Sequence, residues 1–487
     1  MARLQKFLAF DLGAESGRAV LGELDGGRLN VREVSRFPNR MLELGGHRFW
    51  NAWRLLDEVK AGMQACSDEA PVSVGIDTWG VDFGLLAADD TLLGLPHSYR
   101  DKRTTGAMQR FLRLVPKRRI YEQTGIQFLP INTLYQLYSM RRDRSPLLKA
   151  ASDLLFMPDF FNYLLTGRKA TEFTIATTSQ LYNPARRAWA SELFKAMEIP
   201  RSLMQDVVQP GTAIGPLLPS VASETGLKRS RVVATASHDT AAAVAAVPAE
   251  GDAWMFISAG TWSLVGVETD KPLVSSAALR HNFTNEGGVG GRLRFLKNVT
   301  GFWLLQELVR SWGEAAEYGA LVQEAAEAEP LRALLDPDAA CFRAPEDMAR
   351  AIAGHCRRTR QSVPRNRAEQ VRVVLESLAL KYRSVRDELE MVTGKKLERV
   401  HIVGGGARNW LLCQMTADAL GLPVHAGPAE ATAVGNILVQ AMAAGKLSSP
   451  EEMRAVVRES FKVKQYQPKS SKNWDAAFER FQSLAGE

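Results

Sequence analysis

Two stretches of the chain place apolar strands and a short polar turn in the same order. Residues 7–24, FLAFDLGAESGRAVLGEL, contain an apolar run, a turn rich in glycine and small residues, and a second apolar run. Residues 253–268, AWMFISAGTWSLVGVE, repeat this order in the second half. Each pattern predicts a β-hairpin, and the repetition predicts two homologous domains that face each other across a cleft. We expect these domains over residues 1–248 and 249–487, divided in the turn-forming stretch that begins at Pro248.

A third stretch, residues 231–247, changes from β-branched residues to small polar residues and then to alanines: RVVATASHDTAAAVAAV. This pattern predicts a strand, a tight turn and the start of a helix. Ser, Asp and Thr are good N-cap residues, so Asp239 could simply accept backbone N–H groups at the helix start. A carboxylate at this turn could equally be a general base at the mouth of a cleft. The local sequence leaves both interpretations open.

Glycines follow a strand pattern at two further places. Residues 400–403 form an apolar run that leads into Gly404–Gly406 and a further helix, an arrangement that lets a nucleotide approach the backbone. The spacing is not GxGxxG, and the chain contains no GxxxxGK[ST] motif, so neither a dinucleotide fold nor a P-loop is favoured. The turn Gly13–Gly17 could bind phosphate through backbone N–H groups or be a plain hairpin turn.

Other motifs carry weaker signals. The glycine cluster at residues 284–288 fits a mobile loop as well as a ligand-binding loop, and residues 72–86 predict two strands joined at Asp77–Gly80. The letters Asp82-Phe83-Gly84 match a protein-kinase motif by chance, since the other kinase motifs are missing. The charged stretch Tyr99–Arg103 predicts a solvated surface, with contact to a polar substrate as the alternative. The steps of three and four between apolar residues after Ala368 predict a long amphipathic helix.

Composition narrows the function classes. The 487 residues are 46% hydrophobic and 24% charged, which is typical of a globular protein of two or three domains. A net charge of +7 is mild on this length, so a nucleic-acid role is disfavoured, whereas small anionic substrates remain compatible. Four scattered cysteines fit reduced thiols and show no zinc-site spacing. With no signal peptide or membrane-spanning run in the sequence, we expect a cytoplasmic protein without membrane partners.

Several motifs together resemble the FGGY family of carbohydrate kinases. They are DLGAESGR, GIDTWGVDFGLL, YRDKRT, GIQFLPINTLYQL, ASHDTAAAV, SAGTWSL, LKNVTGFWLLQ, HIVGGGARN and GPAEATAVGN, and they span nearly the whole chain. The resemblance implies an α/β protein with two ribonuclease-H-like domains, of the actin, hexokinase and Hsp70 ATPase type, around a central cleft. The N-terminal domain would bind the sugar and carry the base, and the C-terminal domain would bind the nucleotide.

The resemblance also implies roles for particular residues, with ATP and Mg²⁺ as cofactors. Contacts to the ATP phosphates would come from Ala14, Glu15, Ser16, Gly17, Arg18 and Thr261, and the nucleotide would be held by Gln306, Gly404, Gly405 and Gly406. The sugar would meet Gly80, His238, Asp239, Thr240 and Asn298, with Asp239 as the proton acceptor. Asp11 would orient Mg²⁺ through its water shell. Glu15 stands where a small residue is common in the family, so its role stays open.

The activity implied is ATP-dependent phosphorylation of L-rhamnulose at O1, which gives L-rhamnulose 1-phosphate and ADP. The partner would be this small sugar, and the protein would be a monomer or a small homo-oligomer. Kinases for L-fuculose or D-xylulose are alternatives, because the stereochemistry of one hydroxyl is read by a few pocket atoms. A non-catalytic actin-like ATPase is a third hypothesis.

Overall fold

The computed structural model describes residues 4–313, 317–343, 345–469 and 472–484. These residues form two compact units that are not continuous in sequence. The first unit contains the chain up to Ala246 together with Glu268–Phe295 and Ala431–Ser460. The second contains Val247–Val267, Leu296–Glu430 and the residues after Ser460. Each unit is built around a mixed sheet, which confirms the predicted α/β class. The cleft between two domains stays a prediction.

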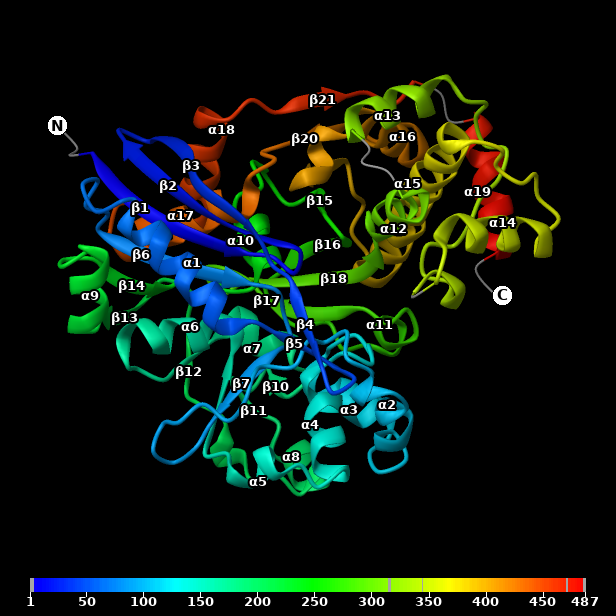
Figure 1. The fold of residues 1–487 in the computed structure, drawn as a ribbon. Coiled ribbons are helices and arrows are strands. Elements are labelled where there is room, and N and C mark those ends of the chain that lie inside the picture. Colours follow the sequence, from blue (N-terminus) through cyan, green and yellow to red (C-terminus); the bar gives the residue numbers. More distant parts are fainter. Residues whose placement is uncertain (1–3, 314–316, 344, 470–471, 485–487) are drawn as a thin grey trace. The chain divides into compact units, whose positions relative to one another are not determined.

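The central sheet of the first unit has six strands in the order β13-β14-β6-β1-β2-β3. Their bounds are β1 Gln5–Leu12, β2 Ser16–Asp25, β3 Arg28–Pro38, β6 Ser73–Thr78, β13 Thr212–Pro216 and β14 Arg231–Ala234. Strands β1 and β2 pair in antiparallel register, which confirms the first predicted hairpin, and β6 pairs in parallel with both β1 and β14. Figure 1 shows β1, β2 and β3 side by side in blue. The carboxyl ends of β1, β6 and β14 therefore share one edge of the sheet.

Shorter strands complete the first unit. They are β4 Met41–Leu44, β5 His47–Trp50, β7 Phe83–Leu86, β8 Asp153–Phe156, β9 Thr171–Glu172, β10 Tyr182–Asn183, β11 Ala188–Trp189, β12 Val207–Val208 and β17 Thr284–Gly287. The two strands predicted over residues 72–86 are present as β6 and β7, but β7 pairs with β8. Residues 284–288 could be a mobile loop by their sequence, but this interpretation is wrong for Thr284–Gly287. These four residues form β17, a strand whose residues are all buried.

The helices of the first unit cover this sheet and surround the shorter strands. They are α1 Ala52–Gln64, α2 Ala107–Phe111, α3 Lys117–Thr124, α4 Thr133–Arg142, α5 Pro146–Ala150, α6 Met157–Thr166, α7 Phe173–Thr178, α8 Ser191–Met197, α9 Pro219–Thr225, α10 Asp239–Ala245, α11 Ser276–Arg280, α17 Ala431–Ala443 and α18 Pro450–Ser460. Helix α10 confirms the predicted strand, turn and helix after Arg231.

Helix α17 supports α10 through very close packing. A Cβ atom on Gly435 would lie 1.8 Å from the carbonyl oxygen of Ala242, so a larger residue would separate the two helices. The amide side chains of α17 reach the central sheet from the same helix. Asn436 bonds to β6, and Gln440 donates to the carbonyl oxygen of Leu8 on β1 at 3.1 Å. The start of α10 is therefore fixed relative to the edge of the sheet.

The sheet of the second unit repeats the arrangement of the first. This sheet has seven strands in the order β17-β18-β16-β15-β19-β20-β21. The bounds not yet given are β15 Trp254–Ala259, β16 Trp262–Thr269, β18 Leu293–Thr300, β19 Arg399–Val403, β20 Val424–Ala426 and β21 Lys464–Tyr466. Strand β17 and the first three residues of β18 are counted with the first unit. The second predicted hairpin is confirmed as β15 and β16, and β19 pairs in parallel with β15 as β6 does with β1.

The helices of the second unit are α12 Trp303–Trp312, α13 Tyr318–Glu327, α14 Met348–Arg358, α15 Arg367–Thr393, α16 Trp410–Leu420 and α19 Lys472–Leu484. Helix α15 is the long amphipathic helix that the apolar spacing predicts. Helix α16 follows β19 and the glycine run, with a 3₁₀ turn over Gly405–Arg408 between them. The predicted order of strand, glycines and helix is therefore confirmed.

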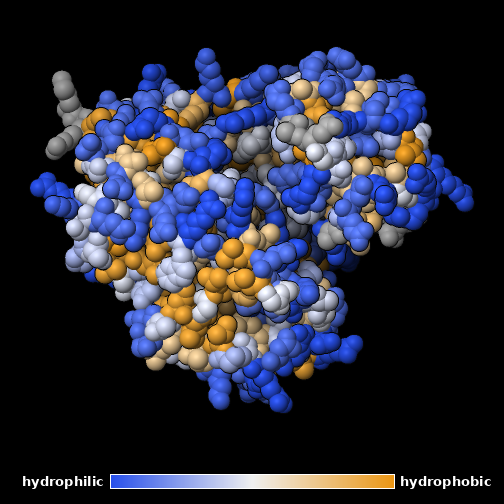
Figure 2. Space-filling model, in the orientation of Figure 1, coloured by the Kyte–Doolittle hydropathy of each residue, from blue (hydrophilic) through white to orange (hydrophobic). Residues whose placement is uncertain are grey.

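The surface of the described residues carries both hydrophilic and hydrophobic side chains. In the face drawn in Figure 2, hydrophilic side chains cover much of the surface, and hydrophobic side chains gather in patches near the centre and the bottom of the view. The large apolar side chains that are exposed include Leu44, Trp53 and Leu114. Among the helices of the described residues, we find none with the length and apolar character that crossing a membrane requires.

Candidate active site

The turn of the first hairpin carries an ion pair at its base. Asp11 and Arg18 lie opposite each other in the register of β1 and β2, and Arg18 donates from Nε and Nη2 to Oδ2 of Asp11 at 2.9 and 2.6 Å. The side chains are 11% and 15% exposed. The Gly13 N–H donates to the Ser16 carbonyl oxygen at 2.9 Å and closes the turn, and Asn39 donates from Nδ2 to the Gly13 carbonyl oxygen. The turn is therefore stabilised both by an ion pair and by hydrogen bonds to its backbone.

Glu15 at the tip of this turn has a cationic partner. Its Oε1 accepts a hydrogen bond from Nη1 of Arg100 at 2.7 Å, and the Arg100 guanidinium also lies over the ring of Tyr99. The negative charge that Glu15 adds beside an expected phosphate site is thus offset by a neighbouring positive charge. The prediction of a solvated surface for residues 99–103 is wrong in part, because Tyr99 and Asp101 are buried. Asp101 is held there by the backbone N–H of Arg48 at 2.7 Å.

Three carboxylates gather at the carboxyl edge of the first sheet. Asp11 and Asp77 are register partners on β1 and β6, and Asp239 follows β14. Asp77 is fully buried, and its Oδ2 accepts a hydrogen bond from Nδ2 of Asn436 at 2.6 Å. Burial, together with the negative charges of Asp11 and Asp239, raises the pKa of Asp77 well above its usual value. The sheet edge is therefore acidic, and the roles that the resemblance implies for Asp11 and Asp239 stay predictions.

Asp239 is the first residue of α10, and its side chain is 32% exposed. The hydroxyl of Thr240 donates to its Oδ1 at 3.0 Å, the Thr240 N–H donates to the same oxygen, and Nε2 of His238 lies 3.4 Å from it. In the described part of the chain no hydrogen bond reaches Oδ2. Burial raises the pKa of Asp239, His238 opposes this shift, and the charge of Asp11 adds to it. One oxygen is thus oriented by the turn, and the other is available to accept a proton.

The two interpretations of Asp239 are compatible in this geometry. His238 occupies the N-cap position and its side chain makes no capping bond, while Asp239 accepts the N–H of Thr240. A carboxylate at a helix start is also stabilised in its charged form by the positive end of the helix dipole.

Buried polar groups that the sequence analysis did not single out hold the turn before α10. The His238 N–H donates to the Thr174 hydroxyl at 3.0 Å, and the Ser237 N–H donates to Oε2 of Glu172 at 3.2 Å. Glu172 is fully buried, and burial raises its pKa to about 7. Arg294 and Glu286 face the imidazole of His238 from the strands β18 and β17. The available signal was a charged residue between two apolar ones, Leu293 and Phe295, in a strand pattern.

Gly80 lies against the helix that carries Thr174. A Cβ atom at Gly80 would stand 3.2 Å from the side chain of Thr178, so this position leaves little room for a larger residue. Asp82 nearby has a structural role, which agrees with the chance interpretation of the kinase-like letters. It is fully buried and accepts bonds from the indoles of Trp50 and Trp79 at 2.6 and 3.0 Å. Burial raises its pKa to about 6.

The structure also brings together the expected nucleotide contacts of the second unit. Nε2 of Gln306 donates to the hydroxyl of Thr261 at 3.2 Å, which joins α12 to the turn of the second hairpin. The glycine run lies against the same hairpin, because a Cβ atom on Gly406 would stand 2.3 Å from Cβ of Ala259. Gly404 has a φ of +78°, and a Cβ atom on Gly405 would meet open space. This surface offers backbone and neutral polar groups to a ligand.

The predicted site residues thus fall into two groups. Asp11, the turn from Ala14 to Arg18, Gly80, His238, Asp239 and Thr240 belong to the first unit. Thr261, Gln306, Gly404–Gly406 and Asn298 belong to the second, where Asn298 lies half-buried on β18. The meeting of the two groups around one substrate stays a prediction, as do the roles of the individual residues.

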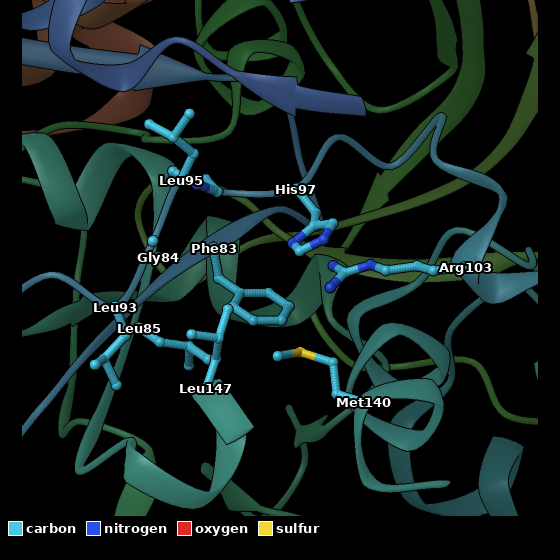
Figure 3. Close-up of a pocket in the computed structure, with 11 residues that line it drawn as sticks. Phe83, Gly84, Leu85, Leu93, Leu95, His97, Arg103, Met140 and Leu147 are labelled. Carbon is cyan, nitrogen blue, oxygen red and sulfur yellow. The ribbon is translucent and has the colours of Figure 1, made fainter. Parts of the chain in front are cut away.

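A small cavity elsewhere in the first unit is lined by described residues that include no carboxylate, unlike the acidic edge of the sheet. Figure 3 shows Phe83, His97 and Arg103 with their side chains turned toward one another, beside Met140. The Arg103 guanidinium lies 5.9 Å from the centre of the Phe83 ring. Burial lowers the pKa of His97 to about 3, so this imidazole is neutral at physiological pH. With no carboxylate in its lining, this cavity does not supply the acceptor that a hydroxyl proton requires.

Comparisons with known proteins agree with the expected family. Residues 6–246 match the N-terminal domain of the FGGY family of carbohydrate kinases, and residues 255–444 match its C-terminal domain. A rhamnulokinase of Bacteroides thetaiotaomicron is 45% identical over 481 residues, which cover 98% of this chain and 99% of the relative. A rhamnulokinase of Bacillus subtilis is 39% identical over 465 residues, which cover 95% of each chain.

Solved structures share the fold at low sequence identity. A ligand-bound xylulose kinase of Lactobacillus acidophilus superposes with a TM-score of 0.81 at 15% identity, over 99% of both chains. A Plasmodium falciparum glycerol kinase with ADP superposes with a TM-score of 0.79 at 12% identity, over 99% of this chain and 97% of the other. The matches to both family domains and to full-length relatives show that the chain belongs to the FGGY family of carbohydrate kinases.

Proposed function

We propose that this protein transfers the γ-phosphoryl group of ATP to the O1 hydroxyl of L-rhamnulose. The observation that carries the chemistry is the Asp239 carboxylate, whose Oδ1 is oriented by its neighbours while Oδ2 accepts no bond in the described residues. Support for the sugar comes from relatives that are named rhamnulokinase and match this chain along nearly its full length.

In the proposed reaction Asp239 is the general base. Its free oxygen takes the proton of the sugar hydroxyl while O1 forms a bond to the γ-phosphorus and the bond from phosphorus to the ADP oxygen breaks. The raised pKa of Asp239 makes its carboxylate a better proton acceptor than an ordinary aspartate. After transfer the proton stays on Asp239 until product leaves.

The two hairpin turns would hold the phosphates. The backbone N–H groups of the first turn and the Arg18 guanidinium provide positive charge for phosphate oxygens, and Thr261 provides a hydroxyl. Gln306 and the glycine run would hold the rest of the nucleotide. Closure of the two domains would exclude water from the phosphates and limit hydrolysis of ATP.

The acidic edge of the first sheet fits a role for Mg²⁺ through its water shell. The described residues include no group of three or more His, Cys, Asp or Glu side chains placed to hold a metal ion directly. Oδ2 of Asp11 is occupied by Arg18, and no hydrogen bond of the described residues uses Oδ1, which leaves it for a metal-bound water. When bound, Mg²⁺ would neutralise charge on the phosphates of ATP.

The test of this proposal is sugar-dependent release of ADP across a panel of ketoses and polyols. We expect the highest kcat/KM with L-rhamnulose and lower values with L-fuculose, D-xylulose and glycerol. A higher kcat/KM for another ketose would show that this ketose, and not L-rhamnulose, is the preferred substrate. ATP binding without any sugar-dependent rate, accompanied by polymerisation in sedimentation experiments, would support an actin-like ATPase instead. The same sedimentation experiments test the predicted monomer or small homo-oligomer.

A further inference from the structure

A fully buried arginine is connected to Asp239 through His238. Arg294 on β18 is 0% exposed, and its Nε donates to the carbonyl oxygen of Gly287 at 2.8 Å. Its Nη2 lies 3.1 Å from Nδ1 of His238, and Nε2 on the other side of that ring lies 3.4 Å from Oδ1 of Asp239. All of these groups belong to the first unit. A continuous line of polar groups therefore joins a buried guanidinium to the proposed base.

The position of Arg294 determines which ring nitrogen of His238 carries the proton. A guanidinium has N–H donors and no acceptor, and it stays protonated in proteins. The contact from Nη2 to Nδ1 satisfies hydrogen-bond geometry, whereas Oε2 of Glu286, 3.3 Å from the same nitrogen, forms no hydrogen bond within the described residues, so Nδ1 accepts from Arg294. A proton on Nδ1 would set two N–H groups against each other across 3.1 Å. In this arrangement the ring proton lies on Nε2, which is the nitrogen that faces Asp239.

Glu286 balances the charge of this arginine. Its Oε2 lies 3.2 Å from Nη2 of Arg294 and 3.3 Å from Nδ1 of His238, and its side chain is 6% exposed. Burial alone would raise the pKa of Glu286, but the positive charge of Arg294 is among the causes that bring that pKa below the usual value. Glu286 is therefore ionised and offsets the buried positive charge.

The backbone of the turn is held by other groups. The His238 N–H donates to the Thr174 hydroxyl, and the Ser237 N–H donates to Glu172. Neither bond involves Arg294 or Glu286. Removing this pair would thus release the imidazole while the turn keeps its backbone bonds.

We propose that Arg294, with Glu286 as its counter-ion, is a positioning residue that holds His238 in the Nε2–H tautomer. This N–H then faces Oδ1 of Asp239, orients the carboxylate and leaves Oδ2 to receive the proton of the sugar hydroxyl. The inference rests on the proposed role of Asp239 as the base.

The test compares two variants of this ion pair. In the double variant Arg294→Met/Glu286→Leu, apolar side chains replace both charges, which avoids leaving one buried ion alone. Arg294→Lys keeps a cationic donor at the same position. Side-chain ¹⁵N NMR of histidine-labelled protein, with the His238 signals assigned through His238→Gln, reports the tautomer directly, and steady-state kinetics report kcat and KM.

We expect the wild type to show only the Nε2–H tautomer of His238. The double variant should no longer show this tautomer alone. The double variant should lose on the order of 10-fold to 10²-fold in kcat with little change in KM for ATP, as expected when an orienting group is removed. Arg294→Lys should recover the tautomer and part of kcat. A wild-type Nδ1–H tautomer would overturn the proposal, and so would a folded double variant with wild-type kcat.

A matched control separates this role from the general effect of deleting a buried ion pair. Arg372 and Glu376 on α15 are 13% and 1% exposed and pair at 2.8 Å in the second unit. Arg372→Met/Glu376→Leu should lower thermal stability without changing the His238 tautomer. A fall of kcat in this control as large as in the first double variant would overturn the assignment. Absence of L-rhamnulose-dependent activity in the wild type would instead refute the proposed function, while the tautomer measurement would still test the geometry.

Discussion

The two hairpins have the same place in their sheets and differ in turn length and in charge. In the first, the Gly13 N–H bonds to the Ser16 carbonyl oxygen at 2.9 Å, and in the second the Gly260 N–H bonds to the Trp262 carbonyl oxygen at the same distance. Strand β1 of the first hairpin pairs in parallel with β6, and β15 of the second hairpin pairs in parallel with β19. The same strand pairing is therefore built twice, with a three-residue turn in the first hairpin and a two-residue turn in the second.

The side chains on these hairpins are of different kinds. The first carries Asp11, Glu15 and Arg18, whose charges are joined in ion pairs. The second carries Ser258, Thr261 and Ser263, and Thr261 bonds to an amide. We infer that the first hairpin interacts with charged groups and that the neighbouring Asp239 accepts a proton. The second hairpin, we infer, positions the nucleotide through neutral hydrogen bonds.

The largest expected effect is at the base. Asp239→Asn keeps the shape of the side chain and removes its ability to take a proton, so we expect kcat to fall by on the order of 10²-fold or more. Affinity for ATP, measured by calorimetry, should stay near the wild-type value. The control is Asp143→Asn at an exposed carboxylate paired with Arg142, which should leave kcat unchanged. Near-normal turnover of Asp239→Asn would show that another group is the base.

The next effect concerns the charged hairpin. Arg18→Met removes both hydrogen bonds to Asp11 and leaves this carboxylate beside the expected phosphate site without its cation. Loss of hydrogen bonds to a charged group costs about 2 kcal/mol, which corresponds to about 30-fold in kcat/KM for ATP. Initial rates at varied ATP concentration measure this. The defect should become smaller as ionic strength rises, because salt screens charges. A defect that does not depend on salt would contradict the electrostatic role.

The pH dependence should come from the first unit. The pKa of Asp239 is raised, and only its ionised form can accept a proton, so kcat/KM for the sugar should be constant above this pKa. Below it kcat/KM should fall about tenfold per pH unit, since the ionised fraction falls by that factor. A rate that rises on acidification through this range would contradict the assignment.

A neutral substitution in the second hairpin should act less strongly. Thr261→Val removes the hydroxyl that accepts from Gln306, and we expect a loss of about 1 kcal/mol, or about fivefold in KM for ATP. The pH profile should keep its shape, displaced by a constant factor, because the removed group does not titrate. A changed profile in steady-state rates would mean that the two hairpins are not divided as proposed.

The smallest effect is expected at the tip of the first turn. Glu15→Ser removes one partner of a partly exposed ion pair with Arg100, and such pairs contribute about 0.2–1 kcal/mol. We expect kcat/KM for ATP to change by about fivefold or less. A much larger loss in the same assay would show that Glu15 acts on the phosphates or the metal directly. Arg119 and Glu192 form an exposed pair elsewhere in the first unit, and Glu192→Ser is the matched control.

The sequence was sufficient to predict the local elements of the site. Both hairpins follow from the alternation of apolar runs and small-residue turns, and the helix at Asp239 follows from the change at Ser237 from β-branched to small residues. These features depend on neighbouring residues. The sequence pattern therefore contains the information that fixes them.

Contacts between distant segments were not predictable in the same way. Residues 284–288 have the composition of a loop, yet Thr284–Gly287 is a buried strand because it packs against α7, where the Gly287 N–H donates to Thr177. Likewise, the buried pair of Arg294 and Glu286 becomes meaningful only when the fold brings it to His238. Tertiary packing decided these positions, and the local pattern gave only the charged residue between Leu293 and Phe295 as a signal.

The position of the phosphate on the product tests the proposed reaction most directly. The protein is incubated with ATP, Mg²⁺ and L-rhamnulose, and the product is identified by ³¹P NMR through the coupling of phosphorus to the attached CH₂ protons. We expect L-rhamnulose 1-phosphate and ADP in equal amounts. Phosphate on a different hydroxyl, or release of free phosphate without a sugar phosphate, would contradict it.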